Sequence, residues 1–361
     1  MGPVQNSDTR TMQLYGALSL LLLIGLVAAA PRPDNSVESK ESAESKESSE
    51  NDHVTITKDF YPSSLAVYSG EHEIVDILVP LNSMNFDDDS EDDDTSDDDE
   101  LIIFFVEADV DAAGGRVDKG LYMLRGGKAQ KLLENGRDAA ASSDDSKEVF
   151  LAASDGIYVY KYNDTAPVKY GTFGEGVISI AKENNTDAVY ALTDSRHLYK
   201  VTDQGQQWTK VEEATGAKEI VLDFSNNLYF YGDDLQPYVI KDGAKKIQGL
   251  PADPKSVRLL NPPFILDDGV PFVSDNVAYI LYANGTSEEG GFDFKPNARP
   301  SAYGVDAVLI QYYAYNKKIY EYNILTILLS DILEELKSYL NTNSGSIRSM
   351  ASRPRTKLHP N

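Results

Sequence analysis

The sequence predicts an all-β protein, a six-bladed β-propeller followed by one C-terminal amphipathic helix outside the repeat. The main observation is a short phrase that recurs about every 40 residues: a small or polar residue, an apolar residue, a tyrosine, then apolar or charged residues. Its six tyrosines are Tyr122, Tyr158, Tyr199, Tyr238, Tyr279 and Tyr320. Successive copies lie 36 to 41 residues apart. A sustained period near 40 with strand-like units is typical of propellers, with one blade per repeat.

Each repeat also contains further strand-like runs. An apolar run leads through a turn rich in Gly, Asp or Asn into the tyrosine strand, as Val149–Ala152 leads into Ile157–Tyr160. A third apolar run lies upstream in several repeats: Val177–Ala181, Glu219–Asp223 and Ser256–Leu260. We expect these upstream runs to be the innermost strands and to face the central axis. A large β-sandwich is the alternative, but a sandwich does not require the phrase itself to repeat.

The composition fits strands better than helices and excludes several kinds of chemistry. The chain has 22 Tyr and 12 Phe against one Trp. It has no cysteine, which excludes thiol catalysis and cysteine-ligated metals, and its four histidines are scattered without zinc spacing. The net charge of −25 argues against a nucleic-acid partner, because nucleic acids need a basic face.

The N-terminus is predicted to be a signal peptide over residues 1–30. Leu14–Ala30 is apolar, ends in three alanines and follows Arg10; Met12 is an alternative start. A membrane anchor is disfavoured because the run is short for a membrane span. The interpretation implies secretion into an extracellular, haemolymph-like fluid. Three glycosylation acceptors agree with secretion: Asn163, Asn184 and Asn284.

Residues 31–53 are predicted to be a disordered linker and residues 54–323 the propeller. Within the propeller, we expect Val54–Pro80 to supply an early strand that completes the last blade. Residues 87–100 contain eleven acidic residues in fourteen and are interpreted as a solvated loop insertion. The alternatives are capture of a basic partner or weak calcium binding, which would be diffuse because the segment lacks the spacing of a calcium loop.

The C-terminal region departs from the repeat. Residues 324–341 have apolar positions at helical spacing and are predicted to form the amphipathic helix. Residues 342–361 are polar and basic and are predicted to be a disordered tail.

No nucleophile elbow, phosphate loop or metal-binding helix motif occurs, so we predict no catalytic residues, no metal and no cofactor. A ligand is expected in the axial channel. The candidates at the ends of the axial strands are Lys182, Glu183, Asp223 and Arg258, and Trp208 is a candidate for stacking on a ligand. The structural interpretation of Asp223 is that it caps a turn. The repeated tyrosines are interpreted as packing residues between blades.

At Asp187–Val201 and Leu228–Ile240 the chain resembles six-bladed propellers of the gluconolactonase-like and YWTD-repeat families, and more closely the ommochrome-binding proteins of lepidopteran haemolymph. The likeness spans about Phe104 to Tyr322 and depends on the rhythm of the repeat. It implies a soluble secreted carrier of tryptophan-derived pigments.

The sequence therefore favours a secreted binding protein for a small planar aromatic ligand such as an ommochrome, and not an enzyme. One alternative is a calcium-dependent hydrolase of the gluconolactonase-like kind, which needs several oxygen ligands converging on the axis. The other is an extracellular protein-interaction module that uses the acidic segment.

Overall fold

The computed structural model describes residues 54–81 and 101–323, apart from residues 145, 163, 265, 267, 308 and 309. The predicted signal peptide (1–30), linker (31–53), acidic insertion (87–100), helix (324–341) and tail (342–361) lie outside the described residues. The chain divides into two units, Met1–Tyr322 and Asn323–Asn361, and the fold described below belongs to the first.

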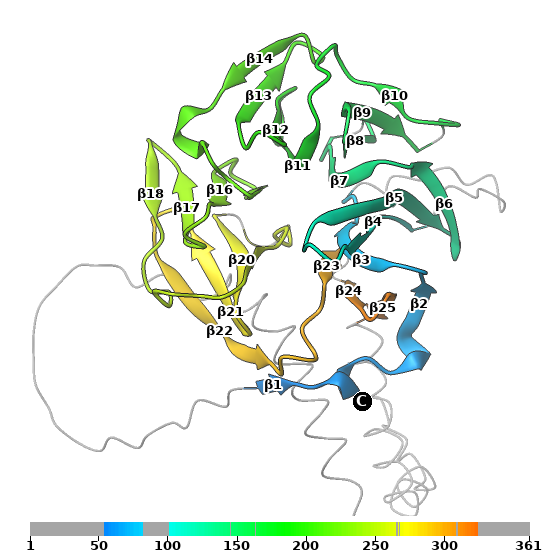
Figure 1. Cartoon of the computed structure of the whole chain (residues 1–361), viewed down its shortest axis with the longest axis vertical. Coiled ribbons are helices and arrows are strands. Elements are labelled where there is room, and N and C mark those ends of the chain that lie inside the picture. The colour runs from blue at the N-terminus through cyan, green and yellow to red at the C-terminus, as the bar shows by residue number, and fades with distance from the viewer. Residues whose placement is uncertain are drawn as a thin grey trace, which may run out of the picture. The chain divides into compact units, whose positions relative to one another are not determined.

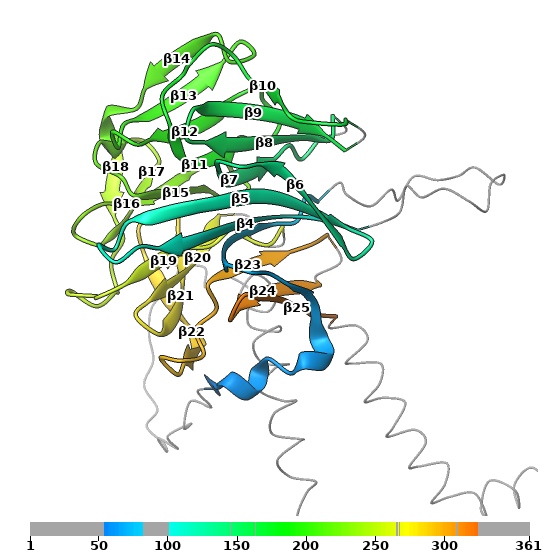
Figure 2. The same ribbon diagram turned by 45° about the vertical axis from the view of Figure 1, so that its right-hand side comes forward.

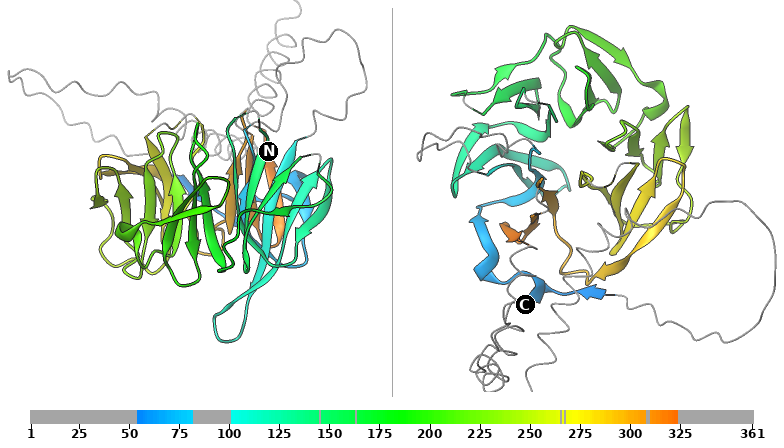
Figure 3. Two further views of the ribbon diagram at one scale, coloured as in Figure 1. Left: turned by 90° about the horizontal axis from the view of Figure 1, so that it is seen from above. Right: turned by 180° about the vertical axis from the view of Figure 1, so that it is seen from behind.

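Six β-sheets are arranged around one axis (Figures 1 and 3). We number them blades 1 to 6 in chain order. In each blade four strands pair antiparallel, and in one blade a fifth strand adds parallel at the outer edge. We call the strand nearest the axis the first strand of its blade. The described residues contain no α-helix, only short 3-10 turns. The prediction of an all-β, six-bladed propeller is confirmed.

Each of the first four blades is built from four strands that are consecutive in strand order. Blade 1 contains β3 (Glu73–Leu78), β4 (Ile102–Val110), β5 (Arg116–Arg125) and β6 (Lys128–Leu133). Blade 2 contains β7 (Gly136–Ala141), β8 (Glu148–Ala153), β9 (Gly156–Lys161) and β10 (Val168–Lys169). Blade 3 contains β11 (Val177–Lys182), β12 (Val189–Thr193), β13 (Leu198–Thr202) and β14 (Gln207–Lys210).

Blade 4 contains β15 (Glu219–Leu222), β16 (Leu228–Tyr231), β17 (Pro237–Ile240) and β18 (Ala244–Lys246). The last two blades differ because each takes one strand from the start of the described chain. Blade 5 contains β19 (Val257–Leu259), β20 (Gly269–Ser274), β21 (Val277–Tyr282), β22 (Ser287–Phe294) and β1 (Val54–Ile56). Blade 6 contains β23 (Ala302–Val305), β24 (Gln311–Tyr315), β25 (Lys318–Tyr322) and β2 (Ala66–Ser69).

The ring is closed by residues 54–69, which we call the strap. The strand β1 pairs parallel with β22 in blade 5, and β2 pairs antiparallel with β25 in blade 6, so the strap spans both blades at their outer edges (Figures 1 and 2). Between them, the ring of Phe60 stacks on Tyr322 with centroids 4.5 Å apart, and the ring of Tyr61 stacks on Tyr315 at 4.2 Å. The expectation that an early strand completes the last blade is confirmed.

The six repeated tyrosines occupy the same place in every blade, on the third strand, which is β5, β9, β13, β17, β21 or β25. Their rings pack against aromatic neighbours or under lysine side chains. Tyr122 stacks on Phe105 and Tyr238 stacks on Phe230, while Lys169 lies over the ring of Tyr158. These contacts agree with the interpretation of the repeated tyrosines as packing residues.

Five clusters of buried apolar side chains join neighbouring blades. They lie between blades 1 and 2, 2 and 3, 3 and 4, 4 and 5, and 6 and 1. A representative pair is Phe104 of blade 1, fully buried beside Tyr160 of blade 2. Burial of these faces supplies most of the driving force for stacking the sheets.

The strap is predicted to contribute measurably to stability through Tyr61. Its side chain is 7% exposed, and its hydroxyl donates a hydrogen bond to the Ala298 carbonyl oxygen at 2.9 Å. We expect Tyr61→Ala to lower the free energy of unfolding by about 3 kcal/mol, through lost burial and a cavity. Tyr61→Phe should cost about 1 kcal/mol, the net value of one hydrogen bond. Urea denaturation followed by circular dichroism measures both.

Val110→Ala is the control, because Val110 is 74% exposed and its truncation should change the unfolding free energy by less than about 0.5 kcal/mol. Equal stability of Tyr61→Ala and the parent protein would show that the strap does not hold the ring closed.

Candidate functional site

The first strands of the blades surround the axis, and each contributes one polar side chain to a common layer. We call this layer the axial ring: Asp76, Asp138, Ser179, Glu219, Arg258 and Tyr303. Its members come from β3, β7, β11, β15, β19 and β23 and surround a small polar cavity of about 30 Å³. The repeat of the fold therefore places six polar groups at one height on the axis.

The axial ring satisfies backbone groups of the neighbouring blade. A first strand has an unpaired edge, and a buried N–H group on that edge needs an acceptor. In blades 2, 3 and 4 the axial side chain accepts a hydrogen bond from a backbone N–H group of the next blade. The residue that donates is the one directly after the axial residue of that next blade. These contacts are Ile180 N to Asp138 Oδ2 (2.8 Å), Ile220 N to Ser179 Oγ (3.5 Å) and Leu259 N to Glu219 Oε2 (3.0 Å).

Burial dominates the electrostatics of the ring. It raises the pKa of Asp76 and of Glu219, and Arg258 partly opposes both shifts. Burial and the charge of Asp76 together raise the pKa of Asp138 well above its ordinary value. Arg258 Nε lies 3.8 Å from Glu219 Oε1, and its Nη2 donates to the Val75 carbonyl oxygen of blade 1. Arg258 thus links blades 5 and 1 through the channel.

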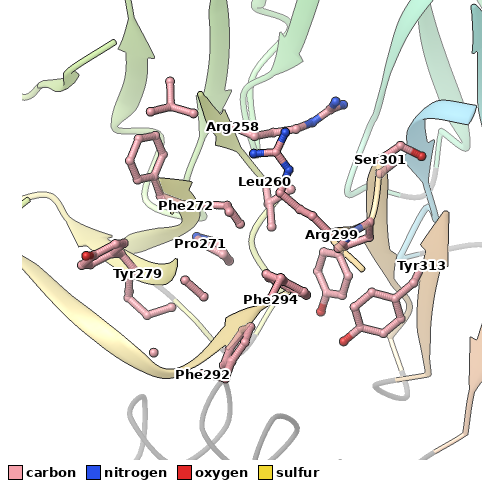
Figure 4. A pocket seen from close by; sticks show the side chains of 18 of the residues that line it. Arg258, Leu260, Pro271, Phe272, Tyr279, Phe292, Phe294, Arg299, Ser301 and Tyr313 are labelled. Carbon is pink, nitrogen blue, oxygen red and sulfur yellow. The ribbon is translucent and has the colours of Figure 1, made fainter. Parts of the chain in front are cut away.

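A second, larger cavity of about 280 Å³ lies between blades 5 and 6 (Figure 4). Its wall is mostly aromatic and aliphatic and includes Phe272, Tyr279, Phe292, Phe294 and Tyr313. It shares three residues with the polar cavity on the axis: Arg258, Leu260 and Tyr303. The cavity between the blades therefore borders the axial ring, and we take the two together as the candidate functional site.

Small and irregular wall residues leave this space open. Ala278, Gly290, Pro300 and Ala302 line it with little side-chain volume. A Cβ atom at Gly290 would lie 3.3 Å from the Ala278 carbonyl oxygen and from the Phe292 ring, so the backbones approach closely there. The register between β21 and β22 is also interrupted after Val277. The cavity thus lies where small residues of blades 5 and 6 face one another.

Two polar groups in the wall are notable for their surroundings. The Tyr303 hydroxyl is buried and has no hydrogen-bond partner among the described residues. Arg299 Nη1 donates to Ser256 Oγ at 2.6 Å and to the Asp275 carbonyl oxygen at 2.7 Å. Buried hydroxyl groups without a partner are unfavourable, so the Tyr303 hydroxyl is suited to meet an acceptor that enters the cavity.

Of the candidates chosen from the sequence, only Arg258 belongs to the axial ring. Lys182 ends β11, and its Nζ donates to the Glu183 and Thr186 carbonyl oxygens. Glu183 is buried and accepts from Lys200 Nζ at 2.7 Å and from the Tyr190 hydroxyl at 3.0 Å. Those bonds lower the pKa of Glu183 against the opposing effect of its burial. Both residues are engaged in their own blade.

Asp223 caps the turn between β15 and β16. Its carboxylate accepts from the backbone N and the Nδ2 of Asn227, both at 2.8 Å, and from the Tyr229 hydroxyl at 3.1 Å. Asp223 also lines a shallow hollow of about 120 Å³ at one mouth of the channel. These bonds match the capping role expected for it.

Trp208 lies on β14, the outermost strand of blade 3, and lines neither cavity. Its indole stacks on Phe173 with centroids 3.8 Å apart, and its Nε1 donates to the Gly205 carbonyl oxygen at 3.0 Å. The structure thus gives Trp208 a packing role at the edge of the blade.

The glycosylation acceptors differ in accessibility. Asn163 lies outside the described residues. Asn184 is half-buried, and its Nδ2 donates to the Phe224 carbonyl oxygen at 3.1 Å, so a glycan would have to displace that bond. Asn284 is exposed on the turn between β21 and β22 and accepts from Thr286 Oγ1 at 2.7 Å.

Within residues 54–81 and 101–323, no group of three or more His, Asp or Glu side chains is arranged to hold a metal ion. In the same part of the chain no helix has the length and apolar character needed to cross a membrane.

No protein-family model matches the sequence, and a search of curated proteins finds no match. Among solved structures, PorZ, a surface component of the type-IX secretion system of Porphyromonas gingivalis, is 15% identical with a TM-score of 0.42, over 60% of this chain and 29% of PorZ. The WD40 repeats of RRP9 are 11% identical with a TM-score of 0.47, over 70% and 77% of the two chains.

The extracellular domain of a putative one-component system from B. thetaiotaomicron is 11% identical with a TM-score of 0.48, over 73% of this chain and 39% of that one. This chain thus spans less than a third of PorZ and less than half of the one-component system domain. The activities and partners of those whole proteins do not transfer to it. A closed propeller with a lined cavity is suited to be a binding or protein-interaction module.

The axial ring predicts an unusual pH dependence. The pKa of Asp138 is raised in the folded protein, so folding favours the protonated carboxyl group. The stability that this group contributes is fully present below about pH 4 and is lost as the pH rises through the raised pKa. Asn cannot ionise, and its amide can keep the bond from Ile180. We therefore expect the unfolding free energy of Asp138→Asn, relative to the parent protein, to increase steadily as the pH rises from 4. Urea denaturation across this range measures the difference.

Asp233→Asn is the control, because its effect on the unfolding free energy should depend on pH in the opposite direction. Hydrogen bonds from Lys218 and Arg196 lower the pKa of Asp233, so its contribution is present at neutral pH and lost on acidification. A stability difference for Asp138→Asn that does not change with pH would contradict the raised pKa.

Proposed function

We propose that this protein binds and carries a small planar aromatic molecule in the cavity between blades 5 and 6. The observation that supports this most is the cavity itself, about 280 Å³ in volume and walled by aromatic rings. Ligand sites for small molecules are concave, mostly apolar and begin at roughly 300 Å³. Flat rings are attracted to such walls because aromatic pairs gain about 0.5 to 1.5 kcal/mol beyond the burial of their area.

The rings that would hold the ligand come from both blades. Phe272, Tyr279, Phe292 and Phe294 belong to blade 5, whereas Tyr313 belongs to blade 6 (Figure 4). A flat molecule between them would contact aromatic rings of both blades. An ommochrome pigment, the ligand class suggested by the resemblance in the repeat, has this planar aromatic character.

Transport outside the cell is part of the same proposal. It is supported by the predicted signal peptide and by the exposed acceptor Asn284, which we propose is glycosylated. Secretion would place the cavity in a fluid where sparingly soluble aromatic molecules need a carrier.

The proposal predicts that protein isolated from its native source has visible absorption from a bound chromophore. It also predicts that titration with xanthommatin quenches the intrinsic fluorescence of the recombinant protein. We expect Phe292→Ala to weaken this binding about ten-fold, since loss of an aromatic contact and its buried area exceeds about 1.4 kcal/mol. Equilibrium titration of both proteins provides the comparison.

Phe173→Ala is the matched control, because Phe173 is also a half-buried phenylalanine but packs on Trp208 outside the cavity. Its affinity should equal that of the parent protein. A colourless native protein together with absent xanthommatin binding would overturn the pigment assignment, and equal affinity of the two variants would place the site elsewhere.

A further inference from the structure

The charges that line the cavity are opposite in sign to the charge of the protein. The chain has 58 acidic and 33 basic residues and a net charge of −25. Yet the charged residues that line this cavity are Arg258 and Arg299, and no Asp or Glu is among them. A purely apolar ligand does not need two guanidinium groups at its binding site.

Arg299 is available to a ligand. Its two hydrogen bonds are to neutral oxygens, those of Ser256 and of the Asp275 backbone, and within the described part of the chain it forms no ion pair. Arginine stays protonated at all relevant pH values and offers five N–H donors, of which these bonds use only part. Its positive charge is therefore not balanced by an adjacent carboxylate.

Arg258 is balanced only in part. Its Nε lies 3.8 Å from Glu219 Oε1, beyond hydrogen-bond length, and this Nε has no hydrogen-bond partner among the described residues. Asp76 also lies near Arg258 in the axial ring, and the structure shows no hydrogen bond between the two side chains among the described contacts. A ligand group at the border between the cavity and the axial ring would therefore meet a cation with weak partners.

The charged groups are collected at one end. Figure 4 shows the Arg258 and Arg299 side chains together on one side of the cavity, with Phe292 and Tyr313 on the other. The buried Tyr303 hydroxyl is a further donor without a protein acceptor among the described residues, and it lies on the aromatic side, because the Tyr303 ring packs against Tyr313 with centroids 5.1 Å apart. The cavity thus has an aromatic part and a part that presents donors and positive charge.

We propose that the ligand of this cavity is an aromatic anion, in which planar rings lie against the Phe292 and Tyr313 side and a carboxylate, sulfonate or phosphate group binds Arg299 and Arg258. This inference rests on the proposed function and specifies the chemical class of its ligand. Charge-assisted hydrogen bonds to arginine are short and about twice as strong as neutral ones. The anionic group fixes the orientation of the rings.

The test uses two fluorescent probes that share one ring system. Anilinonaphthalene sulfonate has an anionic group, and phenylnaphthylamine is the same aromatic system without it. Fluorescence titration of the full chain should show the sulfonate binding about ten-fold more tightly than the neutral probe. Phe292→Ala should weaken both probes, which assigns the signal to the cavity.

Arg299→Gln should reduce the ratio of the two affinities by weakening only the sulfonate, and Arg258 should retain part of the preference. Arg299→Lys keeps the charge and should retain most of the preference. Arg196→Gln is the matched control, because Arg196 pairs with Asp233 far from the cavity lining, and the ratio should be that of the parent protein.

The outcomes separate the two proposals. If both probes bind equally well in the cavity, the anion preference is wrong and the aromatic carrier stands. If neither probe nor pigment binds, the carrier and the anion preference are both wrong. If the sulfonate is preferred but Arg299→Gln keeps the full preference, the assignment to this arginine is overturned.

Discussion

The closure of the ring by the strap is the constraint on which the rest of this structure depends. Each blade buries its faces only against its neighbours, so an open array would leave one face of blade 1 and one of blade 6 in water. The pairing of β2 with β25 and of β1 with β22 ties the beginning of the described chain to its last two blades. With no cysteine in the chain, backbone pairing and the stacking of Phe60 and Tyr61 must hold this junction.

The same junction explains where the cavity lies. Blades 5 and 6 are joined from outside by the strap, and Arg299, which lies just before β23, donates to Ser256 Oγ and to the Asp275 carbonyl oxygen of blade 5. Small wall residues such as Gly290 and Ala302 then leave a space with aromatic borders. A ligand there would contact both blades that the strap connects, and binding should favour the closed ring by mass action.

Much of the fold could be predicted from the sequence because the repeated tyrosine marks a single structural position. Each copy lies on the third strand of its blade, so six copies meant six blades. Arg258 can be predicted as an axial residue because the strand that contains it, the innermost strand of blade 5, has a clear apolar pattern. Asp138 and Tyr303 were missed because their strands, Gly136–Ala141 and Ala302–Val305, are rich in small residues and resemble loops. A search for polar residues at the 40-residue period in the first strands would have found Asp138, Ser179, Glu219 and Arg258 together.

The cavity could not be predicted in the same way. It arises from the fit between the facing surfaces of two neighbouring sheets, and an apolar residue that lines a space has the same pattern as one that fills it. Phe292 and Tyr313 therefore look like core positions in the sequence, and only the arrangement of the blades distinguishes them.

The central claim is that the interface between blades 5 and 6 is the ligand site of a closed propeller. A crystal structure of the protein with a bound aromatic anion tests it most directly. The account predicts electron density for the rings beside Phe292 and Tyr313, with the anionic group within hydrogen-bond distance of Arg299 or Arg258. Density at another site, or an apolar cluster that fills this interface in the crystal, would contradict it.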